Sequence, residues 1–162
     1  MEENEQVEIP SEPQEIDLND LSGRKIGEKV EKEKLDGKTV KIVDIKLVPT
    51  EGLKKTKDGL KEYRAVLFKV FYDNLETYEN YGGVMQFKHG ENYAEPTIWA
   101  EGKSAAAKLL QLWVNFKGAD IKNVSFKDFF KGIIGLTGVI ETKTVSYQGE
   151  DFVKNVIKEL KE

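Results

Sequence analysis

The spacing of apolar residues changes twice along this chain, and that change limits the folds it can adopt. Between residues 38 and 99 apolar and polar residues mostly alternate, as in β-strands. Between residues 105 and 116 the apolar residues recur at i, i+4, i+7, i+8 and i+11, which makes one stripe on a helix. From residue 133 the alternation returns. The chain is therefore predicted to form three strands, one main helix and two further strands.

The strands are predicted at 38–49, 63–72 and 81–88, with 96–99 as a short return strand. In the first, Val43, Ile45 and Leu47 are expected to share one face. In the second, the expected core face is the alternating set Val66, Phe68, Val70 and Tyr72. Gly82-Gly83 in the third indicates a bulge or bend.

The main helix is predicted within 102–118 and ends at Gly118. A short second helix is expected after Ser125, an N-cap residue. A fourth strand is predicted over 133–145, followed by a turn at 147–150. The apolar residues of 152–160 also fit helical spacing, but the preceding hairpin turn favours a fifth strand.

Three strands, a helix and two strands is the chain order of an OB-fold, a five-stranded Greek-key barrel with a helix between strands three and four. We therefore expect a mainly β protein of this class. The domain is predicted at 38–162, after a disordered acidic tail at 1–23 and a charged lead-in at 24–37.

Charge is distributed unevenly along the chain. Residues 1–23 contain eight acids and no Lys or Arg, so they carry −8, and the remainder carries −4 − (−8) = +4. The acidic segment has three interpretations: a solubilising extension, a hook for a protein partner, or a competitor for the basic surface.

Several classes of function are poorly supported. The chain has no cysteine, which excludes disulfides and thiolate zinc sites. His89 is the one histidine, and Gly102-Lys103-Ser104 lacks the glycine that a phosphate-binding loop needs at position 97, which is Thr97. We expect no enzyme activity, no cofactor and no metal. The N-terminus does not resemble a signal peptide, and no run of about 18 apolar residues exists, so a cytoplasmic protein without a membrane partner is expected.

A lysine-rich loop separates the first two predicted strands, in T-E-G-L-K-K-T-K-D-G-L-K-E-Y, residues 50–63. Its lysines are candidates for binding a phosphate backbone, because each would displace condensed counterions. They are Lys54, Lys55, Lys57 and Lys61. The alternative is a solvated hairpin that has no ligand.

Other candidates lie on the predicted strands. Tyr63, Lys69 and Phe71 alternate with the core face of the second strand, and Met85 and Phe87 share one face of the third. Exposed aromatic rings can stack on any nucleobase, although these residues could instead belong to the packed core. Arg64 lies on the other face but near the loop, within reach of a phosphate. Lys143 and Tyr147, in the loop between strands four and five, are candidate clamps.

Three segments carry a family resemblance: D-G-K-T-V-K-I-V-D-I followed by the basic loop, S-A-A-A-K-L-L-Q-L-W, and F-F-K-G-I-I-G-L-T-G-V-I-E followed by a glycine turn and F-V-K-N-V-I. Over residues 35–161 the chain resembles OB-fold single-stranded DNA-binding proteins of phage and archaeal type. The resemblance implies sequence-tolerant binding of single strands in replication, recombination or repair. Such proteins often have an acidic tail at the C-terminus, whereas here it is N-terminal.

The expected partner is thus single-stranded DNA, with RNA left open. The alternative is a protein-interaction adaptor or virion-associated structural module that binds no nucleic acid and uses the barrel and the acidic tail.

Overall fold

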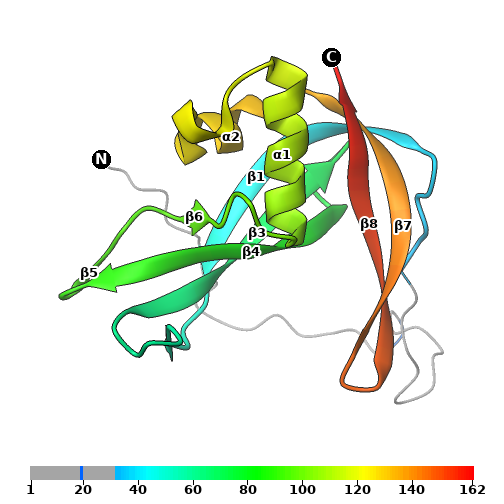
Figure 1. Cartoon of the computed structure of the whole chain (residues 1–162). Coiled ribbons are helices and arrows are strands. Elements are labelled where there is room, and N and C mark those ends of the chain that lie inside the picture. Colours follow the sequence, from blue (N-terminus) through cyan, green and yellow to red (C-terminus); the bar gives the residue numbers. More distant parts are fainter. Residues whose placement is uncertain (1–18, 20–31) are drawn as a thin grey trace. The chain divides into compact units, whose positions relative to one another are not determined.

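The computed structural model describes residue 19 and residues 32–162, and the latter form a compact unit with its own core. Figure 1 shows its elements in chain order. They are β1 (Thr39–Pro49), β2 (Lys54–Lys55), β3 (Glu62–Tyr72), β4 (Tyr78–His89), β5 (Asn92–Tyr93), β6 (Thr97–Ile98), α1 (Ala105–Lys117), the 3-10 helix η2 (Ile121–Asn123), α2 (Phe126–Gly132), β7 (Thr137–Tyr147) and β8 (Glu150–Lys161). The predicted tail, except residue 19, and the first part of the lead-in lie outside the described residues.

The fold is mainly β, as predicted. Its antiparallel sheet has the order β5-β4-β3-β1-β7-β8, and β2 and β6 add to β3 and β4. The five long strands match the five predicted ones, and residues 152–160 are a strand because β8 pairs along its whole length with β7. Gln148 and Gly149 both have positive φ, which is the geometry of a tight two-residue hairpin turn.

The prediction of a closed five-stranded barrel is wrong. The described sheet has eight strands and stays open between β4 and β8, which form no backbone ladder. Side chains occupy the place of that ladder: Glu79 Oε1 accepts the N–H of Asn155 at 2.8 Å, and the Tyr81 hydroxyl accepts the N–H of Ile157 at 2.9 Å. Because these β8 amides already have partners, they cannot bond to the carbonyls of β4.

This side-chain seam between β4 and β8 is buried and polar. Glu79 is 1% exposed, and its carboxylate also contacts Lys32 and, at 3.4 Å, Lys154. The Tyr72 and Tyr81 hydroxyls lie 2.6 Å apart, and Tyr72 donates to the carbonyl of Asn155 at 2.7 Å. Every buried polar group named here has a partner, as burial requires.

Residues 32–37 also belong to the described unit. The Asn155 side chain accepts the N–H of Leu35 at 3.1 Å and donates to the carbonyl of Glu33 at 2.9 Å. Asp36 accepts the N–H of Thr142 at 2.9 Å, and Leu35 packs against the core. This part of the predicted lead-in is therefore fixed to β7 and β8.

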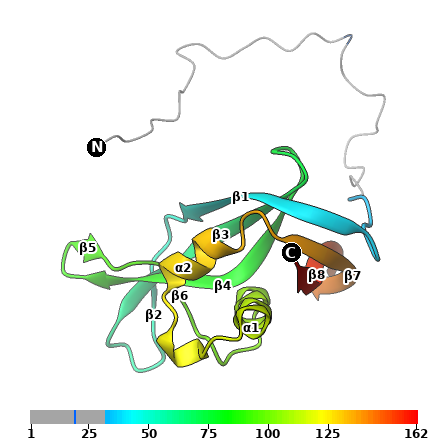
Figure 2. The same ribbon diagram turned by 90° about the horizontal axis from the view of Figure 1, so that it is seen from above.

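The core lies between the inner face of the sheet and the helices. In Figure 2, α1 lies between the β3–β4 part of the sheet and the β7–β8 hairpin. Val66, Phe68, Val70 and Tyr72 are buried, as predicted. In β1 the first core residues are Val40 and Ile42. Val43 lies at a break in register between Ile42 and Asp44, so it does not continue the face of Ile45 and Leu47 as predicted.

Both predicted helices form, with Gly118 and Ser125 as the predicted caps and Ser104 as a further N-cap. Ser104 accepts the N–H of Ala107 at the start of α1, and Gly118 ends the helix in a left-handed conformation. Ser125 accepts the N–H of Asp128 at the start of α2. Gly83, at the predicted bulge in β4, has φ +110, and a Cβ there would lie 2.2 Å from Ser104 Oγ. The bulge therefore lets α1 begin directly against β4. Among the described residues, no helix is long and apolar enough to cross a membrane.

Candidate nucleic-acid interface

The side of β1, β3 and β4 that faces away from the core collects most of the predicted site residues. Tyr63 pairs with Phe87, Ala65 with Met85, Lys69 with Asn80 and Phe71 with Tyr78. On β1, Lys46 pairs with Lys69 and Val48 with Leu67. We refer to this surface as the outer face, and it comprises Asp44, Lys46, Val48, Tyr63, Ala65, Leu67, Lys69, Phe71, Tyr78, Asn80, Met85 and Phe87.

One end of the outer face holds an aromatic pair beside lysines. The rings of Tyr63 and Phe87 are 5.9 Å apart and half-buried. Lys61 Nζ lies 5.5 Å from the centroid of the Phe87 ring, and Lys54 on β2 pairs with Tyr63. Cations beside ring faces are favourable here and remain near solvent. The arrangement places positive charge next to surfaces on which a base can stack.

The other end of the outer face holds a second aromatic pair. Phe71 and Tyr78 have ring centroids 5.3 Å apart, with Lys46 Nζ 5.5 Å from the Phe71 ring and Lys69 Nζ 4.8 Å from the Tyr78 ring. Phe71 is only 5% exposed, whereas Tyr78 is 39% exposed. Phe71 was predicted to contact bases, but it is buried against Tyr78 and Lys46, so of these two rings only Tyr78 is open to solvent.

Between the two aromatic pairs lies an aliphatic strip. Val48 and Leu67 face each other across β1 and β3, and both are exposed. Met85 is half-buried beside them on β4, opposite Ala65. Such a strip on an otherwise charged surface is suited to contact with apolar parts of a ligand.

The lysine-rich loop is an ordered hairpin turn. Thr56 donates its N–H to the carbonyl of Lys61 at 2.9 Å, and Gly59, with φ +71, donates to the carbonyl of Thr56 at 2.8 Å. Asp58 accepts the Thr56 hydroxyl and the N–H of Leu60, and these hydrogen bonds lower the pKa of its carboxyl. The carboxylate of Asp58 is thus held by the turn itself. Lys54, Lys55 and Lys57 project from it into solvent.

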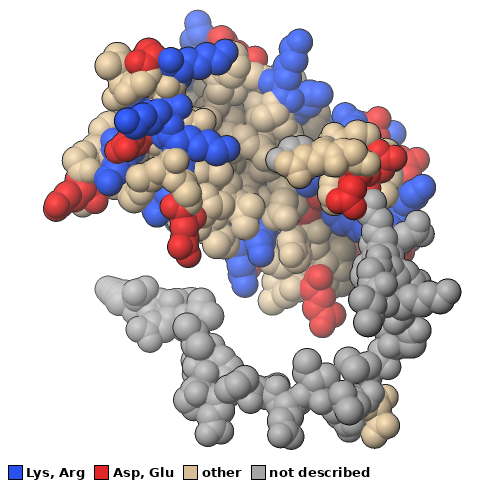
Figure 3. Space-filling view, turned by 90° about the horizontal axis from the view of Figure 1, so that it is seen from below, with Lys and Arg blue, Asp and Glu red and all other residues tan. Residues whose placement is uncertain are grey.

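The lysines of this region form no ion pair within residues 32–162, although the charge of Lys61 contributes to lowering the pKa of Asp58. None of Lys46, Lys54, Lys55, Lys57, Lys61 and Lys69 forms an ion pair there with a described acid. Figure 3 shows one group of Lys and Arg side chains at the left of the view, the side on which β2 and β5 lie in Figure 2, and others along its top and right edges. Unpaired cations are the ones available to phosphates.

Arg64 points away from the outer face, as predicted. Its guanidinium stacks on the ring of Tyr93, 3.6 Å from the centroid, and its Nε donates to Gln86 Oε1 at 3.0 Å. These contacts join β3 to the β4–β5 hairpin. A phosphate contact by Arg64 stays a prediction.

The two predicted clamp residues do not extend the outer face in the described structure. Lys143 lines a separate hollow between α1 and the β7–β8 hairpin, where it lies 3.8 Å from Glu141. The side chain of Tyr147 lies outside the described residues. Lys143 lies within β7, where it pairs with Lys154, so it is not in the loop between strands four and five as predicted.

Reasoning from sequence missed Tyr78, Lys46, Val48 and Leu67 as parts of the interface. Side chains alternate between the two faces of a strand, so Lys46 was predictable as a residue on the face of β1 that Ile45 and Leu47 do not occupy. Trp99 was not among the candidate site residues either. It is 71% exposed just after β6, and a Cβ at Gly102 would lie 3.1 Å from its ring. Gly102 therefore leaves the space beside this ring that a larger residue would occupy.

Within the described part of the chain, no three His, Asp or Glu side chains lie close enough together to hold a metal ion. Comparison with protein-family models, curated proteins and solved structures found no match to this chain.

Proposed function

We propose that this protein binds single-stranded DNA with little sequence preference. The binding surface would be the outer face together with the lysine-rich loop of residues 50–63, called the lysine hairpin below. The observation that carries the proposal is the Tyr63–Phe87 ring pair. Lys61 lies over the Phe87 ring, and Lys54 on the neighbouring strand β2 is the cross-strand partner of Tyr63. A base and its phosphate require these two kinds of group at adjacent places.

Each part of the surface has a separate task in this mechanism. Lysines of the hairpin neutralise phosphates and release their counterions, which drives binding without reading sequence. Tyr63, Phe87 and Tyr78 stack on bases, and every base offers a flat face for this contact. The aliphatic strip of Val48 and Leu67 lies between the two ring pairs and completes a continuous path.

The strand connectivity adds support at the level of the fold. β1 pairs with β3 and β7, β3 pairs with β4, and β7 pairs with β8. These are the neighbours expected in an OB barrel, with the pairing of β4 and β8 replaced by the polar seam. This connectivity supports a fold related to the OB class, whose members bind oligonucleotides on the corresponding face.

The test is a fluorescence-anisotropy titration of a labelled dT oligomer of about 25 nucleotides, longer than one domain of this class covers. Wild type is compared with Lys54→Ala/Lys55→Ala/Lys57→Ala at two salt concentrations. Each lost phosphate contact lowers the slope of log K against log salt by about 0.7, so the triple variant should have a slope shallower by roughly 2.

The matched control is Lys122→Ala/Lys127→Ala/Lys131→Ala, which removes the same charge from exposed positions at and beside α2. It should bind more like wild type than the hairpin variant does. Absence of binding at low salt, or equal losses in the two triple variants, would refute the proposal. A parallel titration with rU of the same length distinguishes DNA from RNA.

A further inference from the structure

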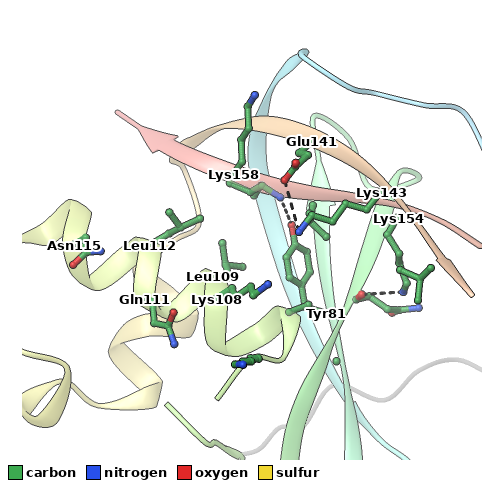
Figure 4. A pocket seen from close by; sticks show the side chains of 17 residues that line it. Tyr81, Lys108, Leu109, Gln111, Leu112, Asn115, Glu141, Lys143, Lys154 and Lys158 are labelled. Atoms are coloured by element: carbon green, nitrogen blue, oxygen red, sulfur yellow. Dashed lines mark hydrogen bonds and ion pairs between the residues drawn. The ribbon is translucent and has the colours of Figure 1, made fainter. Parts of the chain in front are cut away.

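A second surface of the domain has a different chemistry from the outer face. A hollow of about 710 Å³ lies between α1, the edge of β4 and the β7–β8 hairpin. Figure 4 shows that Lys108 on α1 and Lys143 on β7 extend toward each other from opposite walls. We call this hollow the α1–β8 groove.

The walls of the α1–β8 groove are largely aliphatic. Leu109 and Leu112 come from α1, and Val145, Val156 and Ile157 come from β7 and β8. Leu112 and Val156 are half-buried and Val145 is exposed, so part of this apolar surface meets solvent. An apolar surface between packed elements is suited to apolar groups of a ligand.

The rim of the groove is strongly basic. Five lysines and one acid line it: Lys103, Lys108, Lys143, Lys154, Lys158 and Glu141. Lys143 lies near Glu141 and Lys154 near Glu79, whereas Lys103, Lys108 and Lys158 form no ion pair with any residue from 32 to 162 that the structure describes. The formal charges of the lining residues give a net charge of 5 − 1 = +4. A groove with this net positive charge favours a negatively charged ligand.

The groove offers nucleobases no ring on which to stack. Its one aromatic lining residue is Tyr81, which is buried, with its hydroxyl bonded to Tyr72 and to the N–H of Ile157. Stacking is the main base contact of sequence-tolerant single-strand binding, so this groove lacks what the outer face provides. Aliphatic side chains and carboxylates match its walls and rim better.

We propose that the α1–β8 groove is a docking site for an acidic segment of a partner protein, in which carboxylates alternate with Ile, Leu or Val. The Ile, Leu or Val side chains of the partner segment pack on Leu112, Val145 and Val156. Its carboxylates pair with Lys103, Lys108 and Lys158. This role does not depend on the proposed nucleic-acid binding, because the two surfaces share no lysine.

The chain itself supplies a probe of this composition. Residues 15–21 read E-I-D-L-N-D-L, with three acids and three aliphatic residues. A fluorescein-labelled peptide of residues 12–23 is titrated with a chain that starts at residue 24 and keeps all of the compact unit from Lys32 onward. Residues 1–23 are then absent and cannot compete with the probe.

The groove variant is Lys103→Ala/Lys108→Ala/Lys158→Ala, and its matched control is Lys54→Ala/Lys55→Ala/Lys57→Ala. The groove variant should weaken peptide binding by at least about tenfold, as expected for loss of three facing charges, while the hairpin variant stays within about twofold of wild type. A peptide with Ile16, Leu18 and Leu21 replaced by Ser, equal in charge, should also bind more weakly. Circular dichroism confirms that each variant is folded.

Three outcomes would overturn the docking site: no peptide binding by the wild-type groove, equal losses in the two lysine variants, or equal affinity for the serine peptide. If dT displaces the peptide and the groove variant loses dT binding, the groove is a nucleic-acid site instead. The dT titration of the hairpin variant is scored separately, so failure of one proposal leaves the other testable.

Discussion

Phe71 and Tyr78 differ in solvent exposure, and this difference decides which of the two rings is available for contact with a ligand. Both belong to the outer face and contact each other, but only Tyr78 is open to solvent. Alternation along β3 predicted correctly that Phe71 leaves the core face. It could not predict that Tyr78 and Lys46, from two neighbouring strands, would cover its ring.

The two residues should therefore respond differently to truncation. Tyr78→Ala removes a stacking ring and should weaken dT binding by about 1–3 kcal/mol with little effect on stability. Phe71→Ala removes a buried ring and should lower the free energy of unfolding by about 3 kcal/mol. Urea denaturation and anisotropy titration measure the two effects, and a Tyr78→Ala protein that binds dT like wild type would contradict the role given to this ring.

Tyr63 provides a second residue-scale test, at the end of the outer face nearest the lysine hairpin. Tyr63→Ala should weaken dT binding by about 1–3 kcal/mol at every salt concentration, because it removes stacking and no charge. The slope of log K against log salt should stay that of wild type. A changed slope would mean that the ring acts through the lysines, and the same titrations measure both quantities.

Among the elements, the polar seam between β4 and β8 is what sequence patterns did not predict. The order of the strands along the chain and the positions of both helices were predicted from periodicity and capping residues. The seam depends on Glu79 and Tyr81. Glu79 precedes the third strand predicted at 81–88, and nothing in the sequence pattern indicates that these two side chains would replace a backbone ladder. The helical spacing of residues 152–160 was misleading for a related reason, because this strand also buries the polar Asn155, whose side chain bonds to the backbone of Glu33 and Leu35.

Burial in the seam raises the pKa of both Tyr72 and Tyr81 well above the usual value for tyrosine. Unfolded tyrosines ionise near pH 10, whereas these stay protonated in the folded chain. The free energy of unfolding should therefore be independent of these groups below about pH 9 and fall above about pH 10, by up to about 1.4 kcal/mol per pH unit for each tyrosine. Urea denaturation at a series of alkaline pH values measures the decline.

The control for this decline is Tyr72→Phe. It should be less stable at neutral pH by about 1 kcal/mol, because the carbonyl of Asn155 loses a donor. Above pH 10 its stability should fall with a smaller slope than that of wild type. An unchanged slope would show that Tyr72 does not contribute to the alkaline transition.

For the whole molecule, the division of charge is the dominant feature. Residues 1–23 carry −8, and the rest of the chain carries +4. A chain that starts at residue 24 changes from net negative to net positive. It should bind dT more tightly at low salt, and the gain should shrink as salt screens the charges. Anisotropy titrations of both chains at two salt concentrations measure this difference, and equal affinity at low salt would show that the acidic segment does not affect binding.

The most direct test of the account is an NMR titration of the ¹⁵N-labelled chain with dT at low salt, because it locates the bound strand by residue. We predict chemical-shift changes at Lys55, Tyr63, Leu67, Tyr78 and Phe87, and none along α1 from Lys108 to Asn115. Changes confined to α1 and β8, or none at all, would contradict the assignment of the outer face as the single-strand interface.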